Sequence, residues 1–134
     1  MKVIYIAGPF RGAHAWAIEQ NVRRAEEAAY AVFAHGHAAL CPHTNTRFFD
    51  GALPDQVFID GTLELMRRCD AVIVLPDFQK SQGTLGEIAE ARRLEMPVAF
   101  LGDLESLSIK SALLDVEHGL ELKKLTDEGK KNHG

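Results

Sequence analysis

Four short apolar runs alternate along the chain with longer segments in which apolar residues recur at helical spacing. The runs are rich in residues that favour strands, and Gly, Pro or polar residues follow them, as is typical of buried strands. They cover residues 3–7, 38–40, 71–75 and 98–101. This alternation predicts βαβ units, and therefore an α/β fold with a parallel sheet of four to five strands and helices on both faces.

Helices are predicted over residues 13–34, 55–68, 84–95 and 104–118. Residues 43–54 lack periodicity and are interpreted as a loop, and loops of this length are usually functional or mobile. Residues 119–125 are expected to add a strand or a short turn, and the polar chain end is expected to fray. We therefore expect one domain over residues 1–125 and a polar C-terminal tail over residues 126–134.

Composition narrows the class of protein. The chain has 134 residues, of which 46% are hydrophobic and 25% charged, as in an ordinary soluble single-domain protein. A net charge of −4 disfavours binding along nucleic acid. No apolar run approaches the ~18 residues of a membrane span, and Met1 leads directly into a strand pattern rather than a signal peptide. Cys41 and Cys69 are too few for a disulfide framework. These features favour a cytoplasmic protein without a nucleic-acid or membrane partner.

The segment from Ser81 to Glu87 holds the strongest candidate chemistry. It follows an apolar run and opens a helical pattern, which places a carboxylate at the carboxyl end of a parallel strand, where open α/β sheets bind ligands. Thr84-x-x-Glu87 also reads as a capping box, so a structural role is the alternative. Gly86 in the first helical turn costs roughly 1 kcal/mol against Ala, which favours a functional reason. The helix dipole is expected to keep Glu87 ionised, as a nucleophile requires.

A second candidate is the loop Gly8-Pro9-Phe10-Arg11-Gly12 between the first strand and a long helix. Its glycine spacing matches neither a Walker A loop nor a dinucleotide fingerprint. A glycine-flanked loop at a helix N-terminus nevertheless makes a plausible phosphate site, in which Arg11 would add a bidentate contact. The alternative is a turn with a solvated Arg. Tyr5 in the preceding strand is either a core residue or part of the site.

Other polar residues are open to ordinary structural readings. Asp60 is expected to be a helix N-cap, and Asp77 lies at the carboxyl edge of the third strand, where it could face the cleft. The six histidines match no metal-site spacing well, and no metal is expected.

With these motifs in place, the chain resembles the nucleoside 2-deoxyribosyltransferase superfamily. The resemblance rests on Tyr5-Ile6-Ala7-Gly8-Pro9-Phe10 and on Gly83-Thr84-x-x-Glu87, and it covers roughly residues 3 to 115. It implies a flavodoxin-like three-layer α/β/α fold, with Glu87 as the nucleophile that attacks the anomeric carbon of a nucleoside and releases the base. It also implies active sites completed by a neighbouring subunit, and therefore a homodimer or higher homo-oligomer.

Within this superfamily the chain is most similar to the branch that hydrolyses 2′-deoxynucleoside 5′-monophosphates. Transferases usually have an Asp six residues before the nucleophile, whereas this chain has Ser81, which in the hydrolase branch binds the 5′-phosphate. Arg11-Gly12 matches the Arg of that branch, and Ser111 matches a Ser that reaches the phosphate across the dimer. Leu113 stands where the branch has Met. A Ser donates a hydrogen bond to a phosphate, whereas an Asp would repel it.

The second catalytic carboxylate departs from the family pattern. Counting back from Asp70 to the family's acidic position gives Thr62, so Asp60 and Glu64 are the two candidates for the proton donor. Tyr5 would hydrogen-bond Glu87 or pack near C2′ of the sugar. In the loop over residues 43–54, Phe48 or Phe49 would stack on the base.

The sequence therefore predicts an N-glycosidase that converts a nucleoside 5′-monophosphate to a free base and a sugar 5-phosphate through a glycosyl-Glu87 intermediate, without a cofactor. Base exchange by a deoxyribosyltransferase is the first alternative. A phosphoribohydrolase ranks lower, because the Pro-Gly-Gly that precedes its Gly-Thr-x-x-Glu motif is missing. A nucleotide-binding module without turnover is the non-enzymatic alternative. The base and the sugar type stay open.

Overall fold

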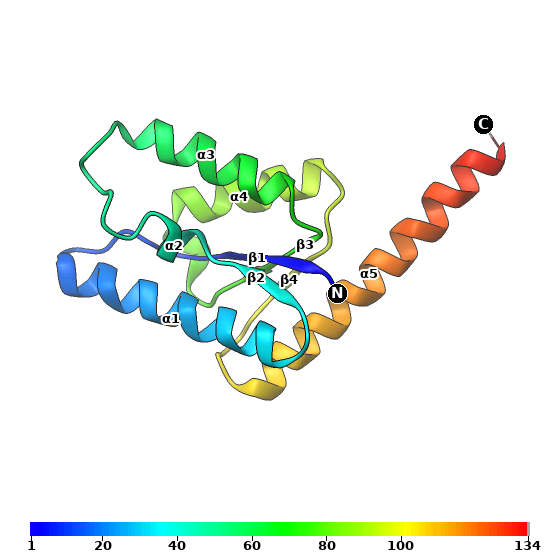
Figure 1. Ribbon diagram of the computed structural model, residues 1–134, viewed down its shortest axis with the longest axis horizontal. Helices are drawn as coiled ribbons and strands as arrows, with labels where there is room; N and C mark the ends of the chain where they lie inside the picture. The colour runs from blue at the N-terminus through cyan, green and yellow to red at the C-terminus, as the bar shows by residue number, and fades with distance from the viewer. Residues whose placement is uncertain (134) are drawn as a thin grey trace.

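A four-stranded parallel sheet forms the middle layer of the molecule (Figure 1). The computed structural model describes residues 1–133. Its strands lie in the order β2-β1-β3-β4 and comprise β1 (Val3–Ala7), β2 (Ala38–Leu40), β3 (Ala71–Val74) and β4 (Val98–Phe100). Every adjacent pair is parallel. The predicted flavodoxin-like α/β fold is confirmed, with four strands.

Side chains of the central strands alternate between two separate cores. Ile4 and Ile6 of β1 point to one face of the sheet, where they join residues of the two helices α1 (Ala15–Ala34) and α5 (Ser106–His133). Tyr5 and Ala7 point to the opposite face, where they join Ile88 and other residues of the helices α3 (Asp55–Arg67) and α4 (Gln82–Arg93). Successive side chains of a strand always take opposite faces, so the position of Tyr5 in β1 fixes the side on which its hydroxyl lies.

The helices form the two outer layers (Figure 1). On one side lie α1 (Ala15–Ala34) and α5 (Ser106–His133), and on the other lie α3 (Asp55–Arg67) and α4 (Gln82–Arg93). Two short helices lie in the connections that approach the sheet's carboxyl edge: α2 (Pro42–Asn45) and the 3₁₀ turn η1 (Phe78–Lys80). The predicted loop over residues 43–54 therefore begins as a helical turn.

The end of the chain differs from the prediction. Instead of a helix that ends at His118, a strand or turn and a frayed tail, α5 continues without a break from Ser106 to His133 and projects beyond the body of the molecule (Figure 1). Gly119 does not interrupt the helix, because its backbone is packed against the residue that precedes β4: a Cβ there would lie 3.0 Å from Cβ of Pro97. The glycine permits close packing rather than a turn. Within residues 1–133, no helix combines the length and apolar character needed to cross a membrane.

The sheet has a topological switch point between β1 and β3, because the chain adds β2 on one side of β1 and then β3 and β4 on the other. The chain moves outward from β1 to β2, then returns across β1 to β3 and continues to β4. Parallel sheets of this kind bind ligands at such a switch point, beyond the carboxyl ends of the two strands. Gly8 follows β1 at this edge and is packed against Leu75, which follows β3.

Replacing Gly8 by Ala is expected to destabilise the protein. The added Cβ would lie 2.8 Å from both Cβ and Cγ of Leu75, and Leu75 is itself buried at 3% exposure, so it has little room to move. Overpacking of this kind typically costs about 1–3 kcal/mol. Urea denaturation of the variant would show this loss as a lower midpoint with an unchanged m-value. The same substitution at Gly61, whose Cβ would meet nothing within 4 Å, is the control and should be neutral or stabilising. A Gly8 variant as stable as the wild type would contradict the packing argument.

Candidate active site

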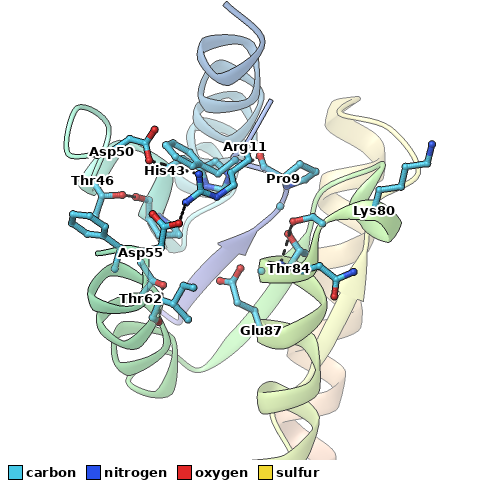
Figure 2. Close-up of a pocket in the computed structure, with 18 of the residues that line it drawn as sticks. Pro9, Arg11, His43, Thr46, Asp50, Asp55, Thr62, Lys80, Thr84 and Glu87 are labelled. Atoms are coloured by element: carbon cyan, nitrogen blue, oxygen red, sulfur yellow. Dashed lines mark hydrogen bonds and ion pairs between the residues drawn. The ribbon is translucent and has the colours of Figure 1, made fainter. Parts of the chain in front are cut away.

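A cavity of about 530 Å³ lies at the switch point, between the N-terminal halves of α3 and α4 (Figure 2). Its size is within the range of small-ligand sites. Four segments line it: the loop after β1, the α2 turn, the beginning of α3, and the segment from η1 into α4. Among the predicted site residues, the cavity brings together Tyr5, Gly8, Pro9, Phe10, Arg11, Ser81, Gly83 and Glu87.

Two unpartnered polar groups lie at the base of the cavity. The Tyr5 side chain is fully buried and its hydroxyl has no hydrogen-bond partner, and Oε2 of Glu87 is likewise buried without one. Figure 2 shows the Glu87 carboxylate directed from α4 into the cavity. Buried polar groups are almost always hydrogen-bonded in folded proteins. The Tyr5 hydroxyl and the Glu87 carboxyl are close enough to shift each other's pKa, but they do not form a hydrogen bond of normal geometry, and a polar ligand that contacts both would satisfy them.

Glu87 lies in the second turn of α4 rather than in its first turn, which corrects the capping-box interpretation. The N-cap is Ser81, whose Oγ accepts a hydrogen bond from the backbone N–H of Thr84 at 3.3 Å and lies 2.8 Å from the Thr84 hydroxyl. No acidic residue occupies the first turn of α4. Glu87 therefore makes no capping contact, and helix formation does not explain it.

Burial raises the pKa of Glu87 from 4.5 to about 7, and the nearby Tyr5 hydroxyl only partly offsets this effect. The expectation that the helix dipole keeps Glu87 ionised is therefore wrong below about pH 7, because desolvation is the larger effect. Burial also raises the pKa of Tyr5, with Glu87 as the second cause, so the phenol stays protonated. A carboxyl group with a pKa near neutrality in a cavity is a common property of catalytic residues.

The N-terminus of α4 forms one wall of the cavity, with Ser81, Gln82, Gly83 and Thr84. Because Ser81 caps the Thr84 amide, the N–H groups of Gln82 and Gly83 are the first-turn donors that remain for a ligand. A Cβ on Gly83 would meet no atom within 4 Å, so the space beside its backbone is open. Lys80 also belongs to this wall, although its side chain points away from the cavity in Figure 2. This arrangement suits an anion.

Arg11 is held by two carboxylates on the opposite wall (Figure 2). Its Nη2 lies 2.6 Å from Oδ2 of Asp55, in the first turn of α3, and its Nη1 lies 3.8 Å from Oδ1 of Asp50. The Arg11 guanidinium is therefore already ion-paired and is not free to bind a phosphate. To reach a phosphate at α4, Arg11 would first have to leave Asp55.

His43 of the α2 turn holds the loop that follows β1. It is 5% exposed, and its Nε2 lies 2.9 Å from the carbonyl oxygen of Pro9, so Nε2 carries the proton and donates it. Burial lowers the pKa of His43, which keeps the ring neutral. The Phe10 ring packs edge-on against His43 at 5.8 Å between centroids. The loop is thus fixed by the α2 turn, where no sequence motif predicted an element.

Aromatic residues line the cavity at Phe10 and Phe58, not at Phe48 or Phe49 as predicted. Phe48 is 83% exposed, and its ring packs under the guanidinium of Arg47. Phe49 instead packs against Phe58, with 6.2 Å between the ring centroids, and so supports the residue that faces the cavity. The error arose because a loop residue was expected to cover the site, whereas the α3 helix does so.

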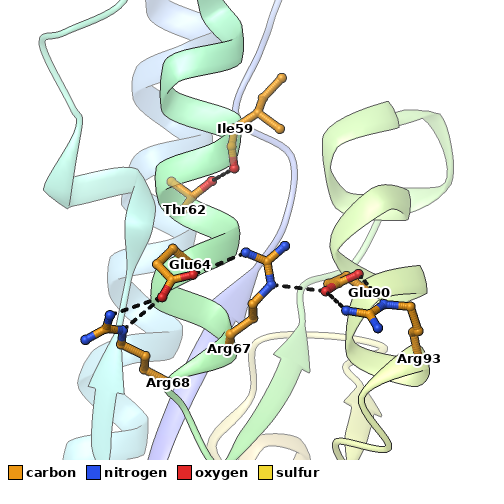
Figure 3. Close-up of polar contacts among 7 residues, drawn as sticks. All are labelled: Ile59, Thr62, Glu64, Arg67, Arg68, Glu90 and Arg93. Carbon is orange, nitrogen blue, oxygen red and sulfur yellow. Dashed lines mark hydrogen bonds and ion pairs between the residues drawn. The ribbon is translucent and has the colours of Figure 1, made fainter.

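Neither candidate for the second carboxylate faces the cavity. Asp60 lies in the middle of α3 rather than at its N-cap, which is Pro54, and its exposed carboxylate accepts a 2.7 Å hydrogen bond from Gln56. Glu64 belongs to an ion-pair network with Arg67 and Arg68, which extends through Arg67 to Glu90 and Arg93 (Figure 3). Arg68 and then Arg67 lower the pKa of Glu64. Thr62, at the family's acidic position, does line the cavity.

Three further predicted residues lie outside the cavity. Leu113 is 2% exposed in the core between the sheet and α5, which corrects the expectation that it contacts a substrate. Gly12 serves packing, because a Cβ there would lie 2.6 Å from Cβ of Ala17. Ser111 is exposed on α5, on the other side of the sheet from the α3 and α4 layer. It would act only on the cavity of a second copy, which stays a prediction.

Several cavity residues were not predicted as site residues, among them His43, Asp50, Asp55, Phe58, Ile59 and Gln82. Asp77, considered as a cleft residue, lines the cavity in a left-handed conformation and pairs with Arg24 at 3.3 Å. Across residues 1–133, His, Cys, Asp and Glu side chains form no group of three or more that could hold a metal ion.

Comparison with solved structures gives a fold relationship. The chain is similar to a 2-deoxyribosyltransferase from the psychrotolerant bacterium Bacillus psychrosaccharolyticus, with a TM-score of 0.59 and 20% identity over 82% of this chain and 81% of that one. At this identity the similarity establishes the fold. No curated protein sequence matched the chain. Residues 2–101 match the family described as a domain of unknown function, DUF7768, and the chain belongs to this family.

Proposed function

We propose that the protein hydrolyses the N-glycosidic bond of a nucleoside 5′-monophosphate, with Glu87 as the nucleophile. The observation that carries this proposal is the pair of buried, unpartnered groups, Tyr5 hydroxyl and Glu87 Oε2, at the base of a cavity of ligand size. A carboxylate nucleophile that forms a covalent sugar ester is the usual device of retaining glycosidases.

The cavity walls support an orientation for such a substrate. The 5′-phosphate would lie at the N-terminus of α4, where the amides of Gln82 and Gly83 and the positive end of the helix dipole meet it. The sugar would lie over Glu87, close to Tyr5. The base would then extend toward the apolar side chains of α3, where Phe58 and Ile59 line the cavity.

The reaction would take place in two steps. In the first, Glu87 Oε attacks C1′, the bond from C1′ to the base nitrogen breaks, and the base leaves with the bonding electrons and takes up a proton. In the second, a water oxygen attacks C1′, the ester bond to Glu87 breaks, and the water gives up a proton. Asp60 and Glu64 do not line the cavity, so the proton for the base would come from water or from another group.

The deciding experiment is a base-release assay on nucleosides and their 5′-monophosphates, ribo and deoxy, with and without an added acceptor base. Release from monophosphates alone is the expected result. Exchange that starts only when an acceptor base is present would instead establish a deoxyribosyltransferase. Binding without any release or exchange would establish a nucleotide-binding module.

The phosphate end can be tested with a pair of glycine variants. Gly83→Ala would place a methyl group in the open space beside the donor amides, and the loss of a charged hydrogen bond is expected to raise KM for the monophosphate about tenfold. The same change should preserve or improve stability, because Ala is the better helix former. Gly61→Ala is the matched control, since Gly61 is also helical and open but lies outside the cavity. An equal KM in both variants would place the phosphate elsewhere.

A further inference from the structure

We infer that Asp55 and Asp50 recognise the base of the substrate, and that they select nucleotides whose base is adenine or cytosine, which carry an exocyclic amino group at the same edge. This inference rests on the proposed function, because it takes the cavity as the substrate site. It adds the class of base, which neither Glu87 nor the phosphate end of the cavity determines.

The two carboxylates lie on the wall that the base would face. Asp55 begins α3, and Phe58 and Ile59 follow it within the next turn and line the same cavity. Asp50 comes from the loop that leads to this helix. With the phosphate at α4 and the sugar over Glu87, the base would extend between the apolar α3 side chains and reach these carboxylates at its far edge (Figure 2).

Arg11 orients the Asp55 carboxylate and lies within ion-pair distance of Asp50. It contacts Oδ2 of Asp55 at 2.6 Å and Oδ1 of Asp50 at 3.8 Å, so the second oxygen of each carboxylate can accept a hydrogen bond from a ligand. The guanidinium is a planar fork that holds its partners in a defined geometry. Arg11 is thus a positioning residue for base recognition, in addition to any contact of its own with the ligand.

The chemistry of a carboxylate determines which bases it can read. An ionised Asp accepts hydrogen bonds and donates none. Adenine and cytosine present an exocyclic amino group as a donor at the edge where thymine, uracil and guanine present a carbonyl oxygen, which would face the carboxylates unfavourably. A site built to pair with a donor discriminates strongly against a ligand that lacks it.

The acidic pair is distinguished from ordinary surface acids by the cavity that it lines. The same cavity contains the Tyr5 hydroxyl, which is fully buried without a partner, so the cavity shows an independent sign of a missing polar ligand. Asp60, one helical turn beyond Gln56 on the same helix, contacts that Gln and does not line the cavity.

The test measures binding and turnover separately. Binding would be measured by calorimetry on a Glu87→Gln background, with the 5′-monophosphates of deoxyadenosine, deoxycytidine, deoxyguanosine and thymidine. We expect the adenine and cytosine nucleotides to bind at least about tenfold more tightly than the guanine and thymine nucleotides. Asp55→Asn should reduce this ratio below about threefold, because the Asn amide can donate to the thymine carbonyl. Asp127→Asn, an exposed change on α5, is the matched control and should preserve the ratio.

Each outcome separates the inference from the proposed function. Equal affinity for all four nucleotides would overturn the inference, and so would an unchanged ratio in folded Asp55→Asn and Asp50→Asn variants. Base release by the wild type from all four at equal rates would also overturn it, while the proposed function would stand. Selective binding without any base release would support the inference and overturn the hydrolase. Circular dichroism would establish that each variant is folded, and Asp50→Asn replaces Asp55→Asn if the latter is not.

Discussion

Replacing Glu87 by Gln is expected to lower kcat/KM for base release by at least about a thousandfold, which is about 4 kcal/mol of transition-state stabilisation. Gln has nearly the same volume as Glu, so the cavity keeps its shape, but an amide cannot form the glycosyl ester. The measurement is chromatographic detection of free base over several hours with the variant and the wild type. A residual rate above about one tenth of the wild-type value would exclude Glu87 as the nucleophile.

The control for this loss lies one turn further along the same helix. Glu90 is ion-paired with Arg67 and Arg93 and does not line the cavity, so Glu90→Gln should leave kcat/KM within about twofold. The pH profile gives a second test of the role of Glu87. A nucleophile must be ionised, so kcat/KM should fall about tenfold per pH unit below the Glu87 pKa of about 7. A loss of activity above this pH would instead identify a proton donor.

Glu87→Gln is also expected to stabilise the protein at alkaline pH. The folded-state pKa of Glu87 is raised from 4.5 to about 7, so the folded protein holds the proton more strongly than the unfolded chain does. The contribution of this residue to stability is therefore fully present below pH 4.5, falls as pH rises toward 7, and stays low above it. The shift corresponds to at most about 3 kcal/mol, which a neutral Gln would not lose.

This stability effect can be measured without any substrate. Thermal unfolding of the wild type and of Glu87→Gln at pH 5 and pH 8 should show little difference in Tm at pH 5, and a gain of roughly 5–10 °C for the variant at pH 8. A gain of equal size at both pH values would indicate better packing of Gln rather than relief from a buried charge. A destabilised variant at pH 8 would contradict the placement of this carboxylate in an apolar environment.

The fold could be predicted from the sequence because its signals are local. Each strand is a short apolar run, and each helix shows its own periodicity, so the order of elements fixed a parallel α/β sheet before any tertiary contact was known. The errors occurred where a tertiary contact changes the meaning of a residue. Gly119 signals a helix end in the sequence, but its contact with Pro97 shows that it is a close-packing position within a continuous helix.

The sequence predicts those site residues that belong to a motif. It does not predict those that only the fold brings to the cavity. Glu87, Ser81 and the loop after β1 belong to recognisable local patterns, and they line the cavity, with the loop doing so from Gly8 to Arg11. His43 comes from a segment without periodicity, and Asp55 begins a predicted helix in which no motif marks it. Their contacts with Pro9 and Arg11 join residues far apart in the sequence. The pKa of Glu87 could not be predicted either. Its position near a helix N-terminus predicts a low pKa, whereas its burial, which the sequence does not show, raises the pKa.

Because side chains alternate between the two faces along β1, the cavity can form only when β1 is paired in the correct register. Ile4 and Ile6 belong to one core and Tyr5 to the other, and the pairing of Tyr5 with Val72 on β3 fixes this assignment. A slip of one residue would bury the phenol among aliphatic side chains and place an isoleucine beneath Glu87. Misfolded molecules would therefore lose the ligand site and the core packing together. The fraction of a preparation that can bind ligand should thus equal the fraction that is natively paired, and ligand titration would count native molecules directly.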